Sequence, residues 1–161
     1  MNPMMDDRRK MLVQIYERYK TGVAEIHTRS GSLRGLRYGP ERYCNFALDL
    51  RGQLRFCSSV DEMTDHPTIY ELVDDKWVAV YSSDSRERVR IVGPLRSEDK
   101  YLAVKESATS VTGVYEYDSA AEEFTELYAD EIFDIAGVRI DPVFGAIGID
   151  ARDPKPNYLY L

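Results

Sequence analysis

The sequence predicts a mainly β protein in which short antiparallel strands follow one another along the chain. Residues 54–81 and 102–128 share one order of apolar, aromatic and acidic side chains, and residues 146–161 repeat part of it. The copies are offset by roughly 45 to 48 residues. A period of roughly 40 to 50 residues carried by strands is typical of β-propeller blades, which stack to bury their faces. We therefore expect a partial β-propeller of about two and a half antiparallel blades, preceded by one N-terminal amphipathic α-helix.

The predicted helix runs from Met4 to about His27, where apolar residues recur at steps of three and four. The residues that form this pattern are Met11, Leu12, Ile15, Tyr19, Val23 and Ile26. Packing against the sheets is the simplest role for such a stripe, and binding to a partner is the alternative. Residues 28–40 contain glycines and a proline with little periodicity, which predicts a connector. Helix and connector together make up residues 1–40.

The blade region, residues 41–161, divides into predicted blades at about 41–85, 88–130 and 132–161. In the first blade, residues 44–50 and 53–59 form a predicted hairpin, and two outer strands follow around a turn at Asp74 and Asp75. The second blade repeats this arrangement. The third has three predicted strands, with turns at the Asp141-Pro142 and Asp153-Pro154 pairs.

Composition limits the partners that we expect. The chain has 161 residues, a formal net charge of −7 and a pI near 4.9. Neutralising a nucleic-acid backbone requires clustered Lys and Arg, so nucleic acid is not an expected partner. No apolar run has the length of a secretory signal or a membrane span, so we expect no membrane partner and a cytoplasmic location. Basic residues do gather near the start, and Arg8, Arg9 and Arg18 are candidates for a partner-binding face on the helix.

The two cysteines, Cys44 and Cys57, are too few for a disulfide framework and lack the paired spacing of zinc ligands. We expect both to be buried, reduced core residues. A cross-strand disulfide is the alternative, which applies if the strands that contain them are neighbours.

Candidates for catalysis or metal binding are sparse. His27 and His66 are the only histidines, and Cys57 with His66 is the one pair of nucleophile and base worth naming. We expect both histidines to be structural or solvated. The acidic loop at residues 61–66 lacks the ligand spacing of an EF-hand, so a charged surface turn is preferred over a weak cation site. No nucleotide-binding glycine motif occurs, and no cofactor is expected. We expect the tyrosines and the tryptophan, which fall at strand positions, to pack in the core or between blades.

The segment from Gly113 to the end resembles the N-terminal propeller of the prolyl oligopeptidase family of serine peptidases, particularly its acylaminoacyl- and dipeptidyl-peptidase-like bacterial members. In that family a blade ends in a "LYxYD…G…EL" hairpin, followed by an acidic "DV…G…DP" segment and a strand ending in "Y…D.P.Y.FLD". The residues that match are Tyr115, Tyr117, Asp118, Glu126, Leu127, Asp134, Gly137, Asp141, Pro142, Tyr158 and Tyr160. The resemblance is good over residues 89–161, fair over 43–81 and absent from the first 40.

In that family the propeller covers an α/β-hydrolase domain, and a Ser, an Asp and a His on the hydrolase domain catalyse the reaction. The nucleophile elbow G-x-S-x-G is missing from this sequence, since the "GSLRG" segment at Gly31 places Ser32 in the wrong register. We expect no hydrolase domain after the blades. The resemblance therefore implies shared ancestry without catalytic activity, and we expect that the chain is not an enzyme.

Three hypotheses about function follow. The first is a non-catalytic, propeller-like module that binds protein or peptide, a truncated or degenerate relative of the peptidase propeller. Because two and a half blades leave a sheet face and strand edges open, we expect self-association or a companion chain that completes the propeller. The alternatives are a non-catalytic subunit of a split prolyl oligopeptidase-type serine peptidase and a small regulatory or host-interaction protein on a β-sheet scaffold.

Overall fold

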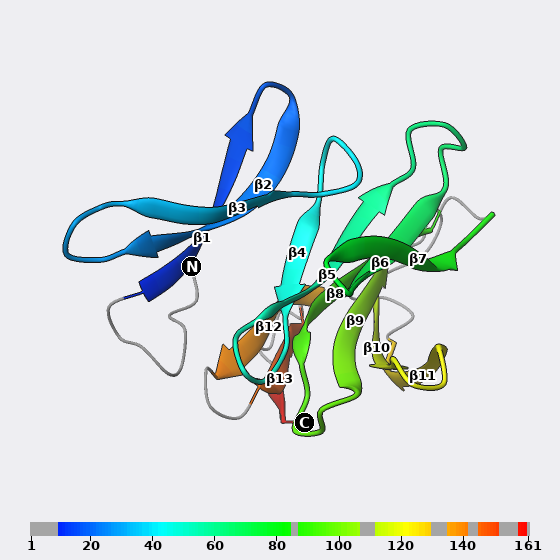
Figure 1. Cartoon of the computed structure of the whole chain (residues 1–161). Coiled ribbons are helices and arrows are strands. Elements are labelled where there is room, and N and C mark those ends of the chain that lie inside the picture. The colour runs from blue at the N-terminus through cyan, green and yellow to red at the C-terminus, as the bar shows by residue number, and fades with distance from the viewer. Residues whose placement is uncertain are drawn as a thin grey trace.

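The described part of the chain consists of antiparallel sheets (Figure 1). The computed structural model describes residues 10–84, 87–106, 112–129, 135–141, 145–151 and 158–160, and within these residues there are strands but no helix. Sheet A contains β1 (Lys10–Glu17), β2 (Lys20–His27) and β3 (Leu33–Tyr38). Sheet B contains β4 (Asn45–Leu48), β5 (Leu54–Val60), β6 (Pro67–Val73) and β7 (Lys76–Ser82). Sheet C contains β8 (Arg88–Pro94), β9 (Lys100–Glu106), β10 (Gly113–Asp118) and β11 (Glu123–Tyr128). Sheet D contains β12 (Ile135–Asp141), β13 (Gly145–Ala151) and β14 (Tyr158–Tyr160).

The order of strands within every sheet follows the chain, and each strand pairs antiparallel with its neighbour in sequence. This up-and-down order, repeated from sheet to sheet, is the construction of propeller blades. The prediction of a mainly β fold with antiparallel sheets is confirmed. Sheets B, C and D occupy the three predicted blade segments, and sheet A adds a fourth sheet that was not expected.

The largest core lies between sheets B and C. It is formed by Ala47, Phe56, Ile69, Val89, Ile91, Tyr101, Ala103 and Tyr117. Strand β9 contributes to two cores, because alternate side chains of a strand point to opposite faces. Its Tyr101 and Ala103 pack toward sheet B, whereas Leu102 and Val104 pack with Ile149 of sheet D. A strand covered on both faces has a continuous apolar run, which in β9 spans residues 101–104. Each large side chain buried in this way stabilises the fold by roughly 1.5–3 kcal/mol.

Sheet A is attached to sheet B by polar contacts. The indole nitrogen of Trp77 in β7 donates a hydrogen bond of 2.9 Å to the carbonyl oxygen of Tyr38. At the neighbouring turn, the guanidinium of Arg37 lies 2.6 Å from the carboxylate of Asp75. These contacts connect the end of β3 to the outer hairpin of sheet B and fix the position of sheet A.

The predicted N-terminal helix is wrong in the part that the structure describes. Residues 10–27 form the antiparallel pair β1 and β2, with Met11 opposite Ile26 and Ile15 opposite Gly22. The segment is rich in β-branched and aromatic residues, which favour strands. Its turn, Arg18 and Tyr19, has positive φ at both residues but lacks the Asn-Gly pair that usually signals such a hairpin.

The predicted connector at residues 28–40 is also corrected, because residues 33–38 form strand β3. Pairing between β2 and β3 shifts from Glu25 opposite Arg34 to Val23 opposite Arg37. Gly35 lies in this β-bulge with a φ of +62°, a conformation that glycine adopts without steric cost. The glycine that suggested a loop therefore marks a bulge within a strand.

The strands predicted in the blade segments are present, and so is the tight turn at Asp74 and Asp75. Both residues adopt positive φ, at 47° and 63°, which aspartate tolerates better than most residues. Sheet D has the three predicted strands. Its two turns, at the Asp141-Pro142 and Asp153-Pro154 pairs, fall wholly or partly outside the described residues.

Candidate binding site

The hairpin turn between β1 and β2 presents two large side chains to solvent. Arg18 and Tyr19 have φ values of 47° and 71°, and the Tyr19 side chain is 71% exposed. Left-handed backbone at a residue other than glycine, Asn or Asp is uncommon and energetically unfavourable. Asn and Gly would form this turn with less strain, so the two side chains are candidates for a functional role.

An exposed stack of four side chains lies beside this turn. The guanidinium carbon of Arg42 is 5.1 Å from the ring centroid of Tyr19 and 5.1 Å from that of Tyr43. The ring of Tyr43 also stacks on that of Tyr16, with centroids 5.8 Å apart and planes within 4°. Cation–π contacts and ring stacking order these side chains although they remain exposed. We call Tyr16, Tyr19, Arg42 and Tyr43 the tyrosine–arginine surface.

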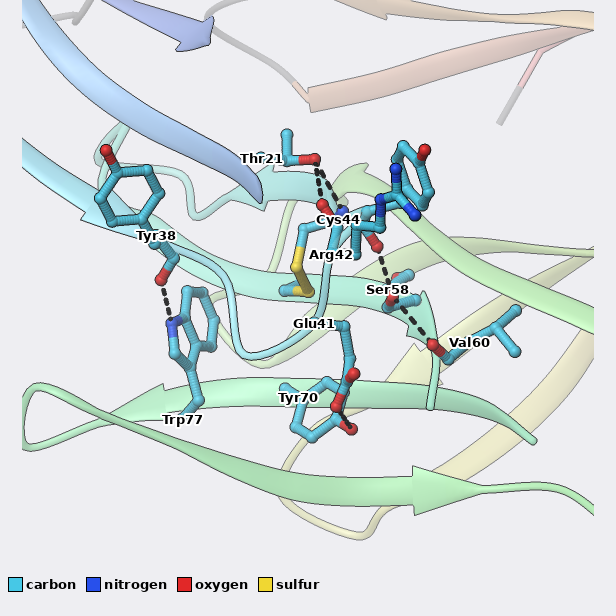
Figure 2. The surroundings of a disulfide bond; sticks show 12 residues. Thr21, Tyr38, Glu41, Arg42, Cys44, Ser58, Val60, Tyr70 and Trp77 are labelled. Atoms are coloured by element: carbon cyan, nitrogen blue, oxygen red, sulfur yellow. Dashed lines mark hydrogen bonds between the residues drawn. A yellow bond between two sulfur atoms is a disulfide. The ribbon is translucent and has the colours of Figure 1, made fainter. Parts of the chain in front are cut away.

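The loop that carries Arg42 and Tyr43 is held by hydrogen bonds to β2 (Figure 2). Both the backbone nitrogen and the hydroxyl of Thr21 donate to the carbonyl oxygen of Arg42, each at 2.9 Å. The same hydroxyl accepts a hydrogen bond of 3.3 Å from the backbone nitrogen of Cys44. Thr21 is 3% exposed, so water does not compete for these bonds. The hydroxyl of Ser59 fixes the far side of the loop by donating to the carbonyl of Tyr43.

A disulfide between Cys44 and Cys57 attaches the same loop to β5 (Figure 2). The expectation of burial is confirmed, since the residues are 3% and 0% exposed, but the expected reduced state is wrong. Pairing of Phe46 with Cys57 in the β4–β5 hairpin leaves the Cα atoms of the two cysteines 5.3 Å apart, within the range that a disulfide spans. Structural disulfides persist mainly in oxidising compartments, which does not favour the expected cytoplasmic location.

The Tyr70 hydroxyl of β6 contacts the loops that contain Glu41 and Asp61. The hydroxyl donates to Glu41 at 2.8 Å and lies 3.4 Å from a carboxylate oxygen of Asp61. Burial and the nearby Glu41 carboxylate raise the pKa of Tyr70, so the hydroxyl stays protonated as a donor. Hydrogen bonds from the backbone nitrogens of Thr64 and Met63 hold the pKa of Asp61 below its usual value. The loops on either side of the tyrosine–arginine surface are therefore preorganised.

A groove of about 770 Å³ runs from Arg42 and Tyr43 along the ends of β5 and β6 to the start of β8. Its lining comprises Arg42, Tyr43, Asn45, Ser58, Ser59, Val60, Asp61, Glu62, Asp65, Pro67, Arg88, Val89, Arg90 and Glu106. A smaller hollow of about 510 Å³ lies on the other side of Arg42 and includes Arg18, Tyr19 and Glu62. Both hollows contain Arg42 and Glu62, so the tyrosine–arginine surface lies at the junction between them.

The residues singled out from sequence have mixed outcomes. Arg18 lies at the β1–β2 turn and lines the smaller hollow, with its side chain 92% exposed. Arg8 and Arg9 lie outside the described residues, so the grouping of the three partner-binding arginines stays a prediction. The roles of Tyr16, Tyr19 and Tyr43 were missed. Tyr16 and Tyr19 fall in the segment predicted as a helix, with Tyr19 on its packing stripe, and Tyr43 stands at the start of the strand region, where aromatic residues were expected to pack in the core or between blades. Arg42 and Arg88 carry no sequence signal that separates them from other surface arginines.

The catalytic and metal-binding candidates do not assemble into a reactive site. Cys57 forms a disulfide with Cys44, so it has no free thiolate that His66 could activate. His66 lies 3.5 Å from the carboxylate of Asp84, and His27 at the end of β2 contacts the hydroxyl of Ser30 at 3.3 Å. Within the described ranges, no group of three or more His, Cys, Asp or Glu side chains is arranged to hold a metal ion. The described part of the chain also contains no helix long and apolar enough to cross a bilayer.

Comparison with solved structures finds a similar β-propeller domain. No protein-family model matches the chain, and no curated protein matches it. Among solved structures, the chain is similar to the β-propeller domain of the Trilobed protease from Pyrococcus furiosus, described as having an open velcro topology, with 11% identity and a TM-score of 0.49. The match covers 93% of this chain and 52% of the other, so this chain spans about half of that length. At this identity and TM-score, the similarity does not establish a family or a function for this chain.

Proposed function

We propose that this chain is a non-catalytic module that binds an extended segment of another protein through the groove and the tyrosine–arginine surface. The observation that carries the proposal is the ordered stack of Tyr19, Arg42, Tyr43 and Tyr16 at the mouth of the groove. Tyrosine and arginine are the residues enriched at energetic hot spots of protein interfaces. Tyrosine also supplies contact area at a low cost in conformational entropy.

The rigidity of the supporting loop also favours recognition. The Cys44–Cys57 disulfide, the hydrogen bonds to Thr21 and the hydroxyl of Tyr70 hold this loop from three directions. A surface that is ordered before it binds loses less conformational entropy on association. The groove offers both arginines and carboxylates, which suits the mixed polar groups of a peptide better than an apolar small molecule.

Peptide selection tests this proposal. We would select a random 12-residue phage-displayed library on the immobilised chain, synthesise the enriched peptides, and measure their Kd by calorimetry. The double variant Arg42→Ala/Tyr43→Ala should weaken binding by at least about tenfold, because a hot-spot side chain contributes about 2 kcal/mol or more. The matched control is Leu33→Ala/Arg34→Ala, which alters exposed residues of β3 that do not line the groove.

Either of two results would contradict the proposal. One is the absence of any enriched peptide after selection on the folded chain. The other is a set of peptides that bind the Arg42→Ala/Tyr43→Ala variant as tightly as the wild type, because binding would then occur elsewhere. Circular dichroism of each variant establishes that a loss of binding is not a loss of fold.

A second candidate is a non-catalytic subunit of a split prolyl oligopeptidase-type peptidase. The hairpin on which that sequence resemblance depends supports it, since β10 contains the matching Tyr115, Tyr117 and Asp118 and pairs with β11. The Asp118 carboxylate caps the turn between them by accepting hydrogen bonds from the backbone nitrogens of Ala120 and Ala121. Affinity purification of the tagged chain from its native cells should then recover a polypeptide with a nucleophile elbow. Recovery of the chain without such a polypeptide would remove this candidate and leave the first unaffected.

A further inference from the structure

We propose that the groove recognises an acidic side chain of the bound segment, and that Arg88 is the residue that pairs with it. This inference rests on the proposed function, since it names the chemistry that the peptide must carry. Arg88 begins β8, the edge strand of sheet C, and lies on the wall of the groove contributed by that sheet.

The local structure of β8 directs two arginines into the groove. Val89 and Ile91 are 5% and 2% exposed and pack in the core between sheets B and C. Successive side chains of a strand point to opposite faces, so Arg88 and Arg90 are exposed and line the groove. Two guanidinium groups thus project from one strand that is anchored by its buried side chains.

Some charged side chains of the groove already have partners within the chain, and others do not. The carboxylate of Glu106 lies 4.0 Å from the guanidinium of Arg90, diagonally across the strand pair. The carboxylate of Asp61 accepts hydrogen bonds from two backbone nitrogens and from Tyr70. Arg88 lies directly opposite Glu106 in the strand pair, but its guanidinium has no ion-pair or hydrogen-bond partner among the residues that the structure describes.

The other charged side chains of the groove indicate where an acidic group of the bound segment lies. Glu62 and Asp65 lie on the loop opposite β8 and are exposed, so an acidic ligand group is repelled from that wall and attracted to Arg88. Arg42 is held between two tyrosine rings and adds positive charge at the groove mouth. Arginine binds a carboxylate through two parallel hydrogen bonds, which adds geometric specificity to the charge.

The test is a charge reversal read out as a change in peptide specificity. Selection of the random 12-residue library on the wild type should enrich Asp or Glu at one position, and selection on Arg88→Glu should enrich Lys or Arg at that position. Wild-type-selected peptides should bind Arg88→Glu at least about tenfold more weakly. The matched control, Arg34→Glu, reverses an exposed arginine of β3 outside the groove and should select the same acidic peptides as the wild type.

The outcomes separate this inference from the proposed function. If peptides bind the groove but carry no preferred acidic residue, or if Arg88→Glu selects the same acidic residue, the assignment of Arg88 is overturned while the binding module stands. If no peptide is enriched on the wild type, both proposals fail. An unchanged circular dichroism spectrum and melting temperature for Arg88→Glu establish that the comparison is between folded proteins.

Discussion

The hydroxyl of Ser58 in β5 lies 2.9 Å from the backbone nitrogen of Ile91 in β8 and accepts its hydrogen bond across the boundary between sheets B and C. Ser58 is 1% exposed, and Ile91 belongs to the edge strand of sheet C. The Ile91 amide is buried at the edge of sheet C, and Ser58 of sheet B supplies the acceptor for it. This bond also fixes the relative position of the two sheets that form the groove.

Substitution Ser58→Ala should lower the free energy of unfolding by about 1–3 kcal/mol, because the Ile91 amide would remain buried without an acceptor. Urea denaturation followed by fluorescence measures the change. The control Ser30→Ala removes a hydroxyl from the exposed β2–β3 turn and should change stability by less than about 0.5 kcal/mol. Equal effects of the two substitutions would show that the bond between sheets does not contribute.

Gly39 packs directly against the disulfide, and this close approach predicts a clash. A Cβ atom at position 39 would overlap the Sγ atom of Cys44 and crowd the ring of Phe46. Gly39→Ala should therefore destabilise the chain by about 1–3 kcal/mol. Gly137→Ala is the matched control, because a Cβ there meets nothing within 4 Å, and it should be neutral or slightly stabilising. Thermal unfolding of both variants decides the matter, and an unchanged melting temperature for Gly39→Ala would contradict the packing described.

The ion pair of Lys100 with Asp118 predicts a dependence of stability on acid pH. The Lys100 ammonium lies 2.7 Å from the Asp118 carboxylate and, with backbone hydrogen bonds from Ala121 and Ala120, holds the pKa of Asp118 below its usual value. A carboxyl group with a lowered pKa in the folded state stabilises the fold above the unfolded pKa of about 3.9. This contribution is lost as the pH falls through the lower folded pKa.

Replacing Asp118 by Asn should therefore reduce the loss of stability between pH 6 and pH 2, measured as the change in urea midpoint. The control Asp74→Asn alters an exposed turn carboxylate in a backbone conformation that Asn also tolerates, so it should leave the acid dependence unchanged. A wild-type-like acid dependence in Asp118→Asn would indicate that other carboxylates dominate acid unfolding.

The strands of sheets B and C could be predicted because local signals agree along that part of the chain. Hydrophobic alternation and acidic turn residues such as Asp74 and Asp75 point to the same hairpins, and β9 is apolar because both of its faces are covered. In residues 10–27 the signals conflict. Met11, Ile15 and Val23 satisfy a helical period and also lie on paired strands, and the Arg18-Tyr19 turn lacks a recognisable turn sequence.

The candidate site could not be predicted, because it depends on contacts between distant segments. Tyr16 and Tyr43 stack only once sheet A is placed against sheet B, and nothing in either local sequence distinguishes them from core tyrosines. The disulfide depends on strand register, since pairing of Asn45 with Ser58 is what brings Cys44 next to Cys57. Both features become visible only when the pairing of strands is known.

Self-association remains a prediction, and the number of strands in each sheet suggests where another chain could pair. Sheets A and D have three strands each in the described part of the chain, whereas sheets B and C have four. Outer strands with unpaired backbone groups are templates for pairing with another chain. We expect light scattering after size-exclusion chromatography to give a mass at least twice that of the 18.5 kDa chain. A monodisperse monomer at all concentrations would reject this expectation.

Relieving the backbone strain of the Arg18-Tyr19 turn should raise stability and weaken peptide binding. Both residues have left-handed backbone, which costs on the order of 1 kcal/mol each when the residue is not glycine, Asn or Asp. The double substitution Arg18→Asn/Tyr19→Gly should therefore raise the free energy of unfolding by about 1 kcal/mol. It also removes the ring that packs on Arg42, so the peptides selected on the wild type should bind more weakly.

The same variant distinguishes a functional turn from a merely tolerated one. Natural proteins retain strained residues where the side chains serve function, and stability gained by relieving the strain is then accompanied by loss of activity. Urea denaturation gives the stability and calorimetry gives the peptide Kd on one protein preparation. If Arg18→Asn/Tyr19→Gly is more stable and binds the peptides as tightly as the wild type, Tyr19 is not part of the binding surface. If it is less stable, the backbone of this turn is not strained.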